Sequence, residues 1–494
     1  MDLSGQAAAE SEATELGSRA QMAVAAVMVA ITSIIYFSWW LQAGRVTNPW
    51  LLLSLALAFL YITAQVYGAC YVYLKMQLPP VRGPFPGHSV DVFVPVYDES
   101  PELVEECLRA AVAMRYPHKT YLIDDRRDPE MQVLAARCGA EYRTRADNRD
   151  AKAGNVNAAL RTTDGEFVVV FDVDHIPDCD FLDAVIAHFA DPKVGFVQAA
   201  VGFRNYGDSW TARATAEQCE DAYGPASLGM YGCDAAPVWG SHCTFRRTAL
   251  DEIGGHGIGL AEDLQTSITL HAAGWHSVFV PALKARGLVP SDFNALTKQQ
   301  FKWARGVFEV LFSTYPAVWR RLTVPQNIAY LLRCTYYLIG PLFLVHALLA
   351  SALLMFGSEL GRQAFTKYLL CSIPMAGAIM MSRRAALSLW NAQGAKVMRW
   401  RGYVQAFSLW PLYALALSSA MLRMQVGHIA TPKVKSGKSH VPLVVPQLAL
   451  FVVLMVSIAW RVIQGPVLYD VMPITFAAFA AYVQIVAYQN ATAE

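Results

Sequence analysis

Two aspartates in the middle of this 494-residue chain stand where they could bind a metal ion. Asp172 and Asp174 follow the apolar run Phe167–Phe171, and on an extended backbone residues two apart face the same side. Two such carboxylates, together with diphosphate oxygens, suit octahedral Mg²⁺ or Mn²⁺. The alternative is an Asp-rich turn at a strand end, and the motif alone is weak evidence. Further acidic and basic groups nearby in the sequence favour the metal site.

Polar side chains also follow two earlier predicted strands. Asp124 and Asp125 end a short strand, and a carboxylate there can accept a hydrogen bond from a uracil N–H or a ribose hydroxyl. Turn chemistry is the simpler explanation for such a pair. Tyr97 and Glu99 end the preceding strand and would line the same nucleotide site.

A lysine before a predicted helix offers a cation for phosphates. Lys152 stands beside Gly154 and Asn155 and leads into the helical pattern Val156–Leu160. A helix N-terminus with an adjacent lysine is a natural diphosphate site, although a surface lysine beside an Asn/Gly cap would look the same. Carboxylates for a metal and a cation for a phosphate together suggest an enzyme of nucleotide sugars.

Glu262 and Asp263 open the amphipathic segment Leu264–His271. In isolation the simpler explanation is a favourable interaction with the helix dipole, worth roughly 0.3–1 kcal/mol. The functional alternative is a general base that removes a proton from an acceptor hydroxyl.

A third group of polar residues precedes the C-terminal apolar segments. Gln299 and Lys302 could hold a diphosphate, and Trp303 offers an apolar face for a sugar ring. The alternative is an amphipathic helix that rests on a membrane surface.

Residues 87–315 have ordinary polarity and alternate predicted strands with helices. Val90–Val96, Tyr121–Ile123 and Phe167–Phe171 are predicted strands, and Glu102–Ala113 is a predicted helix. This alternation indicates an α/β domain with a mostly parallel sheet. Ligands bind beyond the carboxyl ends of such strands, where the acidic groups described above are expected to meet.

Apolar segments flank this domain on both sides. Hydrophobic residues make up 55% of the chain and charged residues 16%. The net charge of +1 and the lack of basic tracts exclude a nucleic-acid-binding protein. The nine cysteines are scattered, which fits reduced thiols better than disulfides or a zinc site. A spanning helix needs about 20 apolar residues. Six segments are predicted to span: Ala20–Ala43, Thr47–Leu74, Cys334–Gly357, Phe365–Met381, Val441–Trp460 and Val471–Tyr488.

The segment Tyr403–Leu422 is also long and uncharged, but basic residues lie on both sides of it. If it crossed the membrane, one strongly basic loop would face outward, against the positive-inside rule. We therefore predict an interfacial helix within residues 383–440, with a seven-span arrangement as the alternative. The expected organisation is a disordered tail (1–19), two spans (20–75), the α/β domain, two spans (328–382) and two further spans (441–490). Both termini and the α/β domain would be cytoplasmic.

The order of these motifs resembles membrane-embedded family 2 glycosyltransferases, including bacterial cellulose synthase catalytic subunits, from about Val90 to the last span. The resemblance implies a Rossmann-like GT-A catalytic domain below a transmembrane channel, a UDP-sugar donor, Mg²⁺ or Mn²⁺, and chain elongation coupled to export. Asp263 would be the base of a TED-type motif beside Glu262, and Gln299–Trp303 would be the Q-x-x-R-W motif. Further similarity lies in Val94–Glu99, Ala151–Asn155, Phe171–His175, Trp303–Gly306, and Gly240-Ser241 before Arg246-Arg247. The region that resembles the acceptor site comprises Gly240, Ser241, His242 and Trp303.

The loop His428–Lys433 looks like the gating loop of this family. The resemblance implies that Thr431 and Lys433 close over the bound nucleotide. A gating loop must face the active site, which supports the topology with an interfacial helix before it.

The chain departs from the cellulose synthase pattern at several positions. Ala261 replaces the Thr of TED, and Lys302 replaces an Arg and thereby loses its bidentate fork. The other departures are Arg126 after the Asp pair, Trp239 and His242 near the acceptor region, and His428 and Ala430 in the gating loop. We also expect no PilZ domain after the last span. These changes fit a β-1,3-glucan (curdlan-type) synthase at least as well as a β-1,4 enzyme.

The leading hypothesis is a processive, inverting β-glucan synthase of a bacterial-type inner (plasma) membrane that uses UDP-glucose. Its partners would be the growing polysaccharide, the lipid bilayer and an accessory export subunit. One alternative is a chitin- or hyaluronan-like synthase that uses UDP-amino sugars, and another is a non-processive glycolipid glycosyltransferase. A transporter with a regulatory nucleotide-sugar domain is disfavoured, because ionisable residues are nearly absent from the predicted spans.

Overall fold

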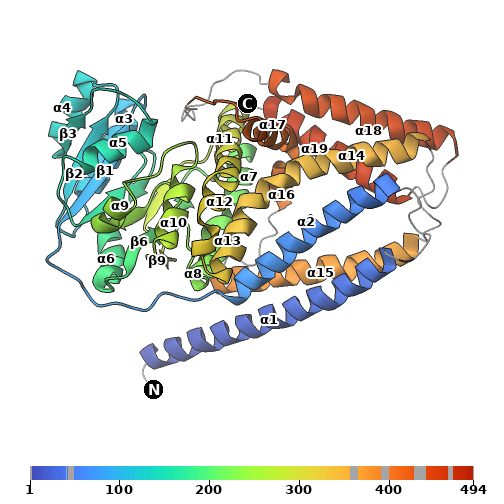
Figure 1. Cartoon of the computed structure of the whole chain (residues 1–494), viewed down its shortest axis with the longest axis horizontal. Coiled ribbons are helices and arrows are strands. Elements are labelled where there is room, and N and C mark those ends of the chain that lie inside the picture. Colours follow the sequence, from blue (N-terminus) through green and yellow to red (C-terminus); the bar gives the residue numbers. More distant parts are fainter. Residues whose placement is uncertain are drawn as a thin grey trace.

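The structure is a computed structural model that describes residues 3–40, 42, 49–356, 365–390, 400–427, 441–465 and 471–492. An α/β domain lies at one end of the molecule, and a bundle of long helices extends from it (Figure 1). The first two helices and the C-terminal helices lie together in this bundle, although the α/β domain separates them in the sequence. The predicted combination of a catalytic-type α/β domain and apolar helices is confirmed.

The α/β domain is built on a seven-stranded sheet with strand order β3-β2-β1-β4-β8-β6-β9. All neighbouring strands pair in parallel except β8, which is antiparallel to both β4 and β6. Its strands are β1 (Val90–Val96), β2 (Lys119–Asp124), β3 (Glu141–Thr144), β4 (Phe167–Val170), β6 (Val194–Ala199), β8 (Cys243–Arg246) and β9 (His276–Val280). A small second sheet has the order β5 (Ile176–Pro177), β10 (Ala285–Gly287), β7 (Gly202–Phe203).

The predicted strands are present in this sheet with small differences at their ends. β1 has the predicted bounds, β2 is longer, and β4 ends one residue before Phe171. The central strands are buried on both faces, which explains their continuous apolar runs. The predicted helix Glu102–Ala113 is α3 (Pro101–Val112), which begins after Ser100 because the Ser100 hydroxyl accepts the Leu103 N–H.

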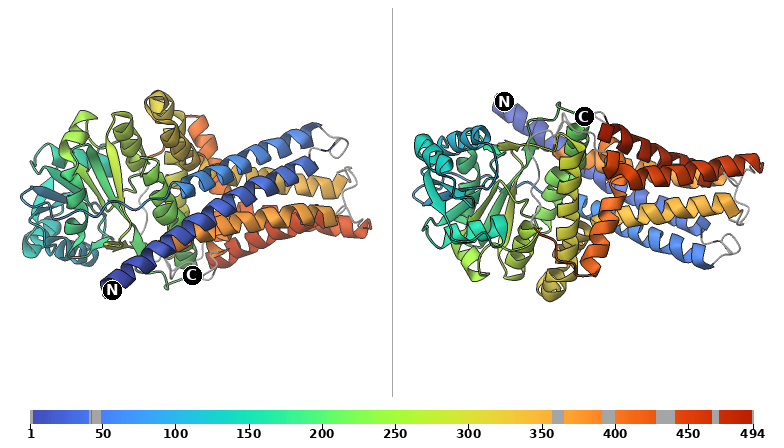
Figure 2. Two further views of the ribbon diagram at one scale, coloured as in Figure 1. Left: turned by 90° about the horizontal axis from the view of Figure 1, so that it is seen from below. Right: turned by 90° about the horizontal axis from the view of Figure 1, so that it is seen from above.

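Helices cover both faces of the large sheet (Figure 2). One apolar core joins the sheet to α3, α4 and α6, and another joins it to α5, α9 and α10. These helices are α4 (Pro129–Cys138), α5 (Ala151–Leu160), α6 (Phe181–Ile186), α9 (Arg247–Glu252) and α10 (Glu262–Ala272). The domain also contains η1 (Ala187–Ala190), α7 (Trp210–Asp221), the π-helical turn η2 (Ala222–Ala226) and α8 (Ser227–Gly232).

A third core connects the domain to the bundle. It packs α10 against helices that follow the domain, through side chains such as Leu264, Phe308, Tyr330 and Tyr413. The helices after β10 are α11 (Phe293–Phe312), α12 (Thr314–Val318), η3 (Trp319–Arg321), α13 (Val324–Thr335), η4 (Tyr336–Leu338) and α14 (Ile339–Phe356). Because α10 carries Glu262 and Asp263, this core fixes both carboxylates relative to the bundle.

Four described helical segments are long and apolar enough to cross a membrane: Gly17–Trp39, Ala56–Leu74, Val324–Phe356 and Val441–Ile463. They belong to α1 (Leu3–Trp40), α2 (Pro49–Leu74), the α13–η4–α14 unit, and η6 (Val441–Val444) with α18 (Val445–Ile463). The predicted spans Phe365–Met381 and Val471–Tyr488 fall on α15 (Phe365–Trp390) and α19 (Val471–Thr492). These helices have 26 and 22 residues, which is long enough to cross a bilayer.

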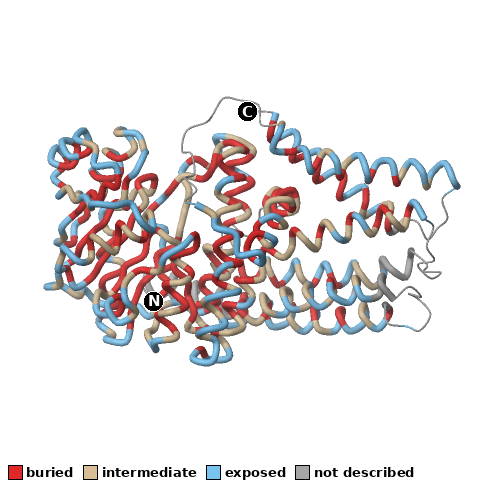
Figure 3. The backbone as a smooth tube through the Cα atoms, turned by 45° about the horizontal axis from the view of Figure 1, so that its top comes forward, coloured by how far each residue is buried: buried red, intermediate tan, exposed pale blue. Residues whose placement is uncertain are grey.

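Many residues of the bundle helices are exposed (Figure 3). Large apolar side chains are among them, as expected for helices that face lipid. Ile34, Leu60 and Ile373 are 64%, 69% and 61% exposed. Buried residues are concentrated in the α/β domain and at its junction with the bundle.

The predicted disordered tail, residues 1–19, differs from the structure, because α1 already begins at Leu3. Residues 7–9 and 13 are alanines and residues 10, 12 and 15 are glutamates, and both residue types have high helix propensity. The helix of the following apolar segment therefore extends through these residues instead of starting at Ala20.

The segment Tyr403–Leu422 forms two helices rather than one. α16 (Trp400–Ser408) and α17 (Trp410–Met421) meet at an angle of 51°. With 9 and 12 residues, neither helix is long enough to cross a bilayer alone, but together they are long and apolar enough for a broken span or a re-entrant loop. Arg401 and Gln405 tie α16 to α7 through hydrogen bonds to Glu217 and Thr215, which keeps this segment against the α/β domain.

Candidate active site

Three ligand-type side chains follow β4. Oxygen atoms of Asp172 and Asp174 and a ring nitrogen of His175 all lie within 4.8 Å of one another. Two carboxylates and an imidazole form a donor set that suits Mn²⁺ or Mg²⁺, so the residues fit the predicted metal. The sequence interpretation identified the two aspartates but not His175, the next residue in the chain.

Lys152 lies beside this cluster, in the first turn of α5. Its Nζ donates to Asp172 Oδ1 at 2.5 Å and to the Gly240 carbonyl oxygen at 2.5 Å. Burial alone lowers the pKa of Lys152, but the charges of Asp172 and Glu262 outweigh burial and raise the pKa above its usual value. The ammonium group is therefore charged and available to an anionic ligand.

Asp263 lies at the N-terminus of α10, close to the same lysine. Burial, and then the charge of Glu262, raise the pKa of Asp263 to about 6, while the Leu264 N–H, Arg333 and Lys152 act in the opposite direction. A pKa near the working pH is what a general base requires. Glu262 itself is buried, with 8% of its surface exposed.

Gly240 provides open space between the candidate base and the lysine. A methyl group on Gly240 would lie 3.5 Å from Asp263 Oδ2 and 3.9 Å from Lys152 Nζ. The residue has a φ of +81°, a conformation that glycine adopts without strain. A substrate hydroxyl can therefore approach both groups without meeting a side chain at this position.

Ser241 and His242, which the resemblance places in the acceptor region, support the loop that carries the aspartates. Ser241 Oγ accepts the Asp172 N–H at 3.1 Å, and His242 Nε2 lies 2.6 Å from His175 Nδ1. Both side chains are buried, and burial, followed by the charge of His175, lowers the pKa of His242. Strand β8 pairs antiparallel with β4, so residues 241 and 242, just before β8, lie beside the residues that directly follow β4.

Asp124 and Asp125 are buried and bonded within the domain. Asp124 accepts the N–H groups of Arg126 and Asp128, each at 2.7 Å, and the Tyr142 hydroxyl at 2.8 Å. These contacts hold the turn after β2, as turn chemistry requires.

Asp125 forms a bidentate ion pair with a residue that sequence reasoning missed. Arg145 Nε and Nη2 donate to the two Asp125 oxygens at 2.6 and 2.7 Å. The same guanidinium donates to the carbonyl oxygens of Arg149 and Ala151, at the start of α5. Asp125 therefore helps to position Lys152 through Arg145. Only the folded chain reveals this, because no sequence pattern relates residues 125 and 145.

Tyr97 and Glu99 lie at the end of β1, as predicted. Glu99 Oε2 accepts the N–H groups of Tyr97 and Asp98 at 2.9 and 3.1 Å, and Tyr97 is 49% exposed. The adjacent Asp98 pairs with Arg126. Tyr97, Asp98 and Glu99 lie at the carboxyl ends of the parallel strands, where Asp124 also lies at the end of β2.

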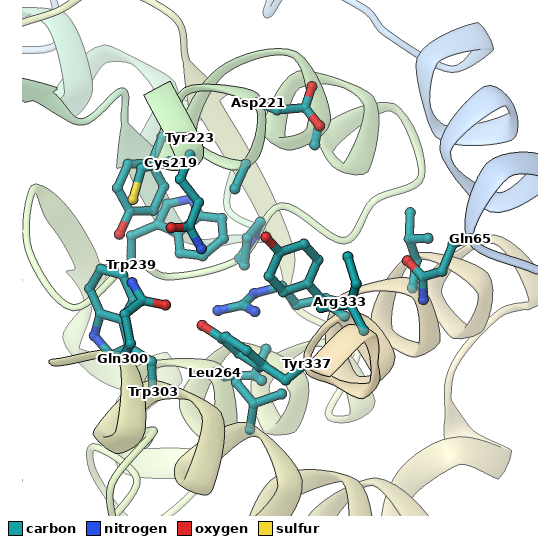
Figure 4. A pocket seen from close by; sticks show the side chains of 18 of the residues that line it. Gln65, Cys219, Asp221, Tyr223, Trp239, Leu264, Gln300, Trp303, Arg333 and Tyr337 are labelled. Atoms are coloured by element: carbon teal, nitrogen blue, oxygen red, sulfur yellow. The ribbon is translucent and has the colours of Figure 1, made fainter. Parts of the chain in front are cut away.

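A cavity of about 760 Å³ joins the site to the bundle (Figure 4). At the domain end it is lined by Lys152, Asp172, Asp174, Gly240, Glu262 and Asp263. Towards the bundle, residues of α2, α14 and α15 line it, including Tyr61, Gln65, His346 and Arg383. Of the predicted site residues, Tyr97, Glu99, Asp124, Asp125, Ser241 and His242 do not line this cavity.

Helix α11 places its predicted residues on the same cavity. Gln299, Lys302 and Trp303 all line it, and Gln299 Oε1 is buried without a hydrogen-bond partner. The neighbouring Gln300 accepts the hydroxyl of Tyr413 from α17 at 2.9 Å. This hydrogen bond joins α11 to α17, the helix that precedes residues 428–433 in the sequence. The predicted gating residues Thr431 and Lys433 lie outside the described residues.

A mixed Rossmann-like sheet with paired aspartates at its edge, a nearby lysine and a buried candidate base defines a GT-A-type glycosyltransferase domain. Comparisons with known proteins agree with this class. Residues 86–306 match the family described as Glycosyltransferase like family 2, and residues 251–391 match the family Cellulose synthase. Together these two matches cover residues 86–391 and confirm the resemblance found in the sequence.

Curated relatives include a cellulose synthase catalytic subunit [UDP-forming] of Pseudomonas fluorescens, 28% identical over 399 residues, or 76% of this chain and 54% of the relative. Cellulose synthase 2 of Novacetimonas hansenii is 32% identical over 330 residues, or 63% of this chain and 20% of the relative. The chain thus spans between a fifth and about half the length of these relatives. A solved mannosyltransferase of Pyrobaculum calidifontis, in complex with GDP-Man and Mn²⁺, has a TM-score of 0.53 and 19% identity, covering 75% of this chain and 99% of its own. That similarity supports the GT-A fold.

Proposed function

We propose that the protein is a processive, inverting β-glucan synthase that polymerises glucose from UDP-glucose and exports the product through its own membrane helices. The observation that carries this proposal is the continuous cavity with Asp263 and Lys152 at one end and residues of α2, α14 and α15 at the other. A soluble transferase has no need for a cavity that continues between apolar helices. A polymerase that extrudes its product requires such a path.

In the proposed reaction, Asp263 takes the proton of the acceptor's terminal hydroxyl. The hydroxyl oxygen forms a bond to the anomeric carbon as the bond from that carbon to the UDP oxygen breaks. Attack from the face opposite UDP converts the α configuration of the donor into a β linkage. The pKa of about 6 keeps Asp263 largely ionised at neutral pH and leaves it basic enough to accept the proton.

The leaving diphosphate is stabilised by nearby positive and polar groups. Lys152 is held in place by Asp172 and the Gly240 carbonyl, so its charge needs little reorganisation during the reaction. Gln299 and Lys302 approach the same cavity from α11. Asp172 and Asp174, with His175, would hold Mg²⁺ or Mn²⁺, which supplies positive charge to the diphosphate when bound.

The acceptor chain would leave the site along the bundle. Trp303 offers its ring to the terminal sugar at the entrance, and aromatic and polar side chains such as Tyr61, Gln65 and Tyr336 continue the lining. The catalytic domain and both termini lie on the cytoplasmic side in this proposal, where UDP-glucose is available. Linkage through O3 or O4 depends on how the terminal sugar is oriented towards Asp263.

The test is product formation by the purified protein in proteoliposomes supplied with labelled UDP-glucose and Mg²⁺ or Mn²⁺. High-molecular-weight label that a β-1,3- or β-1,4-glucanase removes would support the proposal and identify the linkage. Incorporation only from a UDP-amino sugar, or only into lipid, would contradict the glucan proposal and favour a chitin- or hyaluronan-like synthase or a glycolipid transferase.

A further inference from the structure

One cationic side chain in the cavity has no role in the reaction described so far. Arg333 extends from α13 into the pocket, between Trp239 and Tyr337 (Figure 4). The central carbon of its guanidinium lies 5.1 Å from the centroid of the Trp239 ring and 5.8 Å from that of Tyr337. Such distances are typical of cation–π contacts.

Both rings are themselves fixed by packing. Trp239 meets the Tyr223 ring edge-on at 4.6 Å and donates its indole N–H to Ser227 Oγ at 2.9 Å. Tyr337 meets the Tyr413 ring edge-on at 4.9 Å. The plane of the guanidinium is therefore held by two anchored aromatic side chains.

The positive charge of Arg333 is not neutralised by an ion pair with any described carboxylate. Within the described part of the chain, no carboxylate lies within ion-pair distance of Arg333, and its Nε is buried without a hydrogen-bond partner. A buried donor of a charged group that has no acceptor destabilises the protein. Arg333 lines the cavity, so a ligand there can supply acceptors to the terminal nitrogens of its guanidinium.

Arg333 lies on the bundle side of the candidate base. Its stacking partner Trp239 directly precedes Gly240, the residue that borders Asp263 and Lys152. The positive charge of Arg333 is also one of the groups that lower the pKa of Asp263 against the effect of burial. A ligand that contacts Arg333 would therefore lie near Asp263.

We propose that Arg333 positions the terminal sugar of the acceptor by donating hydrogen bonds to its hydroxyl groups, so that one hydroxyl faces Asp263. The inference rests on the proposed function. A guanidinium is a planar set of donors without acceptors, whereas an ionised carboxylate is only an acceptor. Neighbouring hydroxyls of one sugar can satisfy both, because one accepts from Arg333 while another donates its proton to Asp263.

The test compares Arg333→Gln and Arg333→Lys with the wild type in proteoliposomes. Three quantities are measured: polymer formation, hydrolysis of UDP-glucose to free glucose, and the Kd of UDP. Arg333→Gln should reduce polymer formation by about 10- to 100-fold, the range for hydrogen bonds to a charged group. It should leave hydrolysis and UDP binding within about twofold, and Arg333→Lys should restore part of the polymerisation because it retains charge and donors.

The matched control is Arg320→Gln, since Arg320 also stacks on a tryptophan, Trp319, but does so outside the cavity. Unchanged polymerisation by Arg333→Gln, or an equal loss of polymerisation, hydrolysis and UDP binding, would overturn the inference. The second outcome would mean that Arg333 only supports the fold. A wild-type protein that neither binds UDP nor consumes a UDP-sugar would overturn the proposed function, and this inference with it.

Discussion

The environment of Asp263 should determine how the reaction rate falls at acidic pH. Burial and the neighbouring Glu262 raise the pKa of Asp263 from 3.8 to about 6. A general base works only when it is ionised, so the rate should fall as the pH drops below 6. At pH 5 about one tenth of the groups would be ionised, against more than about nine tenths for an unperturbed aspartate.

The assay is UDP release from UDP-glucose at low donor concentration, so that kcat/KM is measured between pH 5 and 8. We expect the rate at pH 5 to be about one tenth of the rate at pH 7. Replacing Glu262 by Gln removes a negative charge that raises the pKa of Asp263, so the acidic limb should move to lower pH. The control Glu130→Gln alters an exposed carboxylate on α4 and should leave the limb in place.

The Glu262→Gln variant also separates the titration of the protein from that of the donor, because an acidic limb due to the diphosphate would not respond to this substitution. A rate that stays constant from pH 7 to pH 5 would refute the assignment of Asp263 as the base. So would an acidic limb that keeps its position in the Glu262→Gln variant.

Three further predictions follow from the contacts around the site. Gly240→Ala should lower kcat with less effect on UDP affinity, because a methyl group would stand 3.5 Å from Asp263 Oδ2 where the acceptor hydroxyl approaches; steady-state kinetics and UDP titration check this. Asp125→Asn should destabilise the protein by about 3–5 kcal/mol, since it removes the bidentate ion pair with Arg145, whose two side chains are 10% and 6% exposed; thermal unfolding followed by tryptophan fluorescence measures the loss. Chelation by EDTA should stop sugar transfer and added Mn²⁺ or Mg²⁺ should restore it, as the oxygen-rich donor set predicts.

The sequence predicted the parts of the site that follow from local pattern. Buried strands in an α/β domain end at one edge, so Asp172 and Asp174 could be expected near a helix N-terminus with Lys152. The structure places Lys152 in contact with Asp172 and Asp263 in the same cavity.

Contacts between distant segments could not be predicted in the same way. Arg333 stands alone in an apolar stretch, and its role depends on the packing of α13 against the loop that carries Trp239. Arg145 is one of several arginines in its region, and only the fold pairs it with Asp125. The contacts of Ser241 and His242 could not be predicted for a related reason. The antiparallel insertion of β8 turns both side chains towards the Asp172 loop.

The central claim is that this domain transfers sugar from a UDP-sugar with Asp263 as the base. The most direct measurement compares the wild type with Asp263→Asn for transfer from labelled UDP-glucose and for UDP binding, in the same reconstituted preparation. The account predicts that Asp263→Asn abolishes transfer, while the Kd of UDP changes by less than about threefold, because the amide keeps the shape but cannot accept the proton. Retained transfer by Asp263→Asn would contradict it.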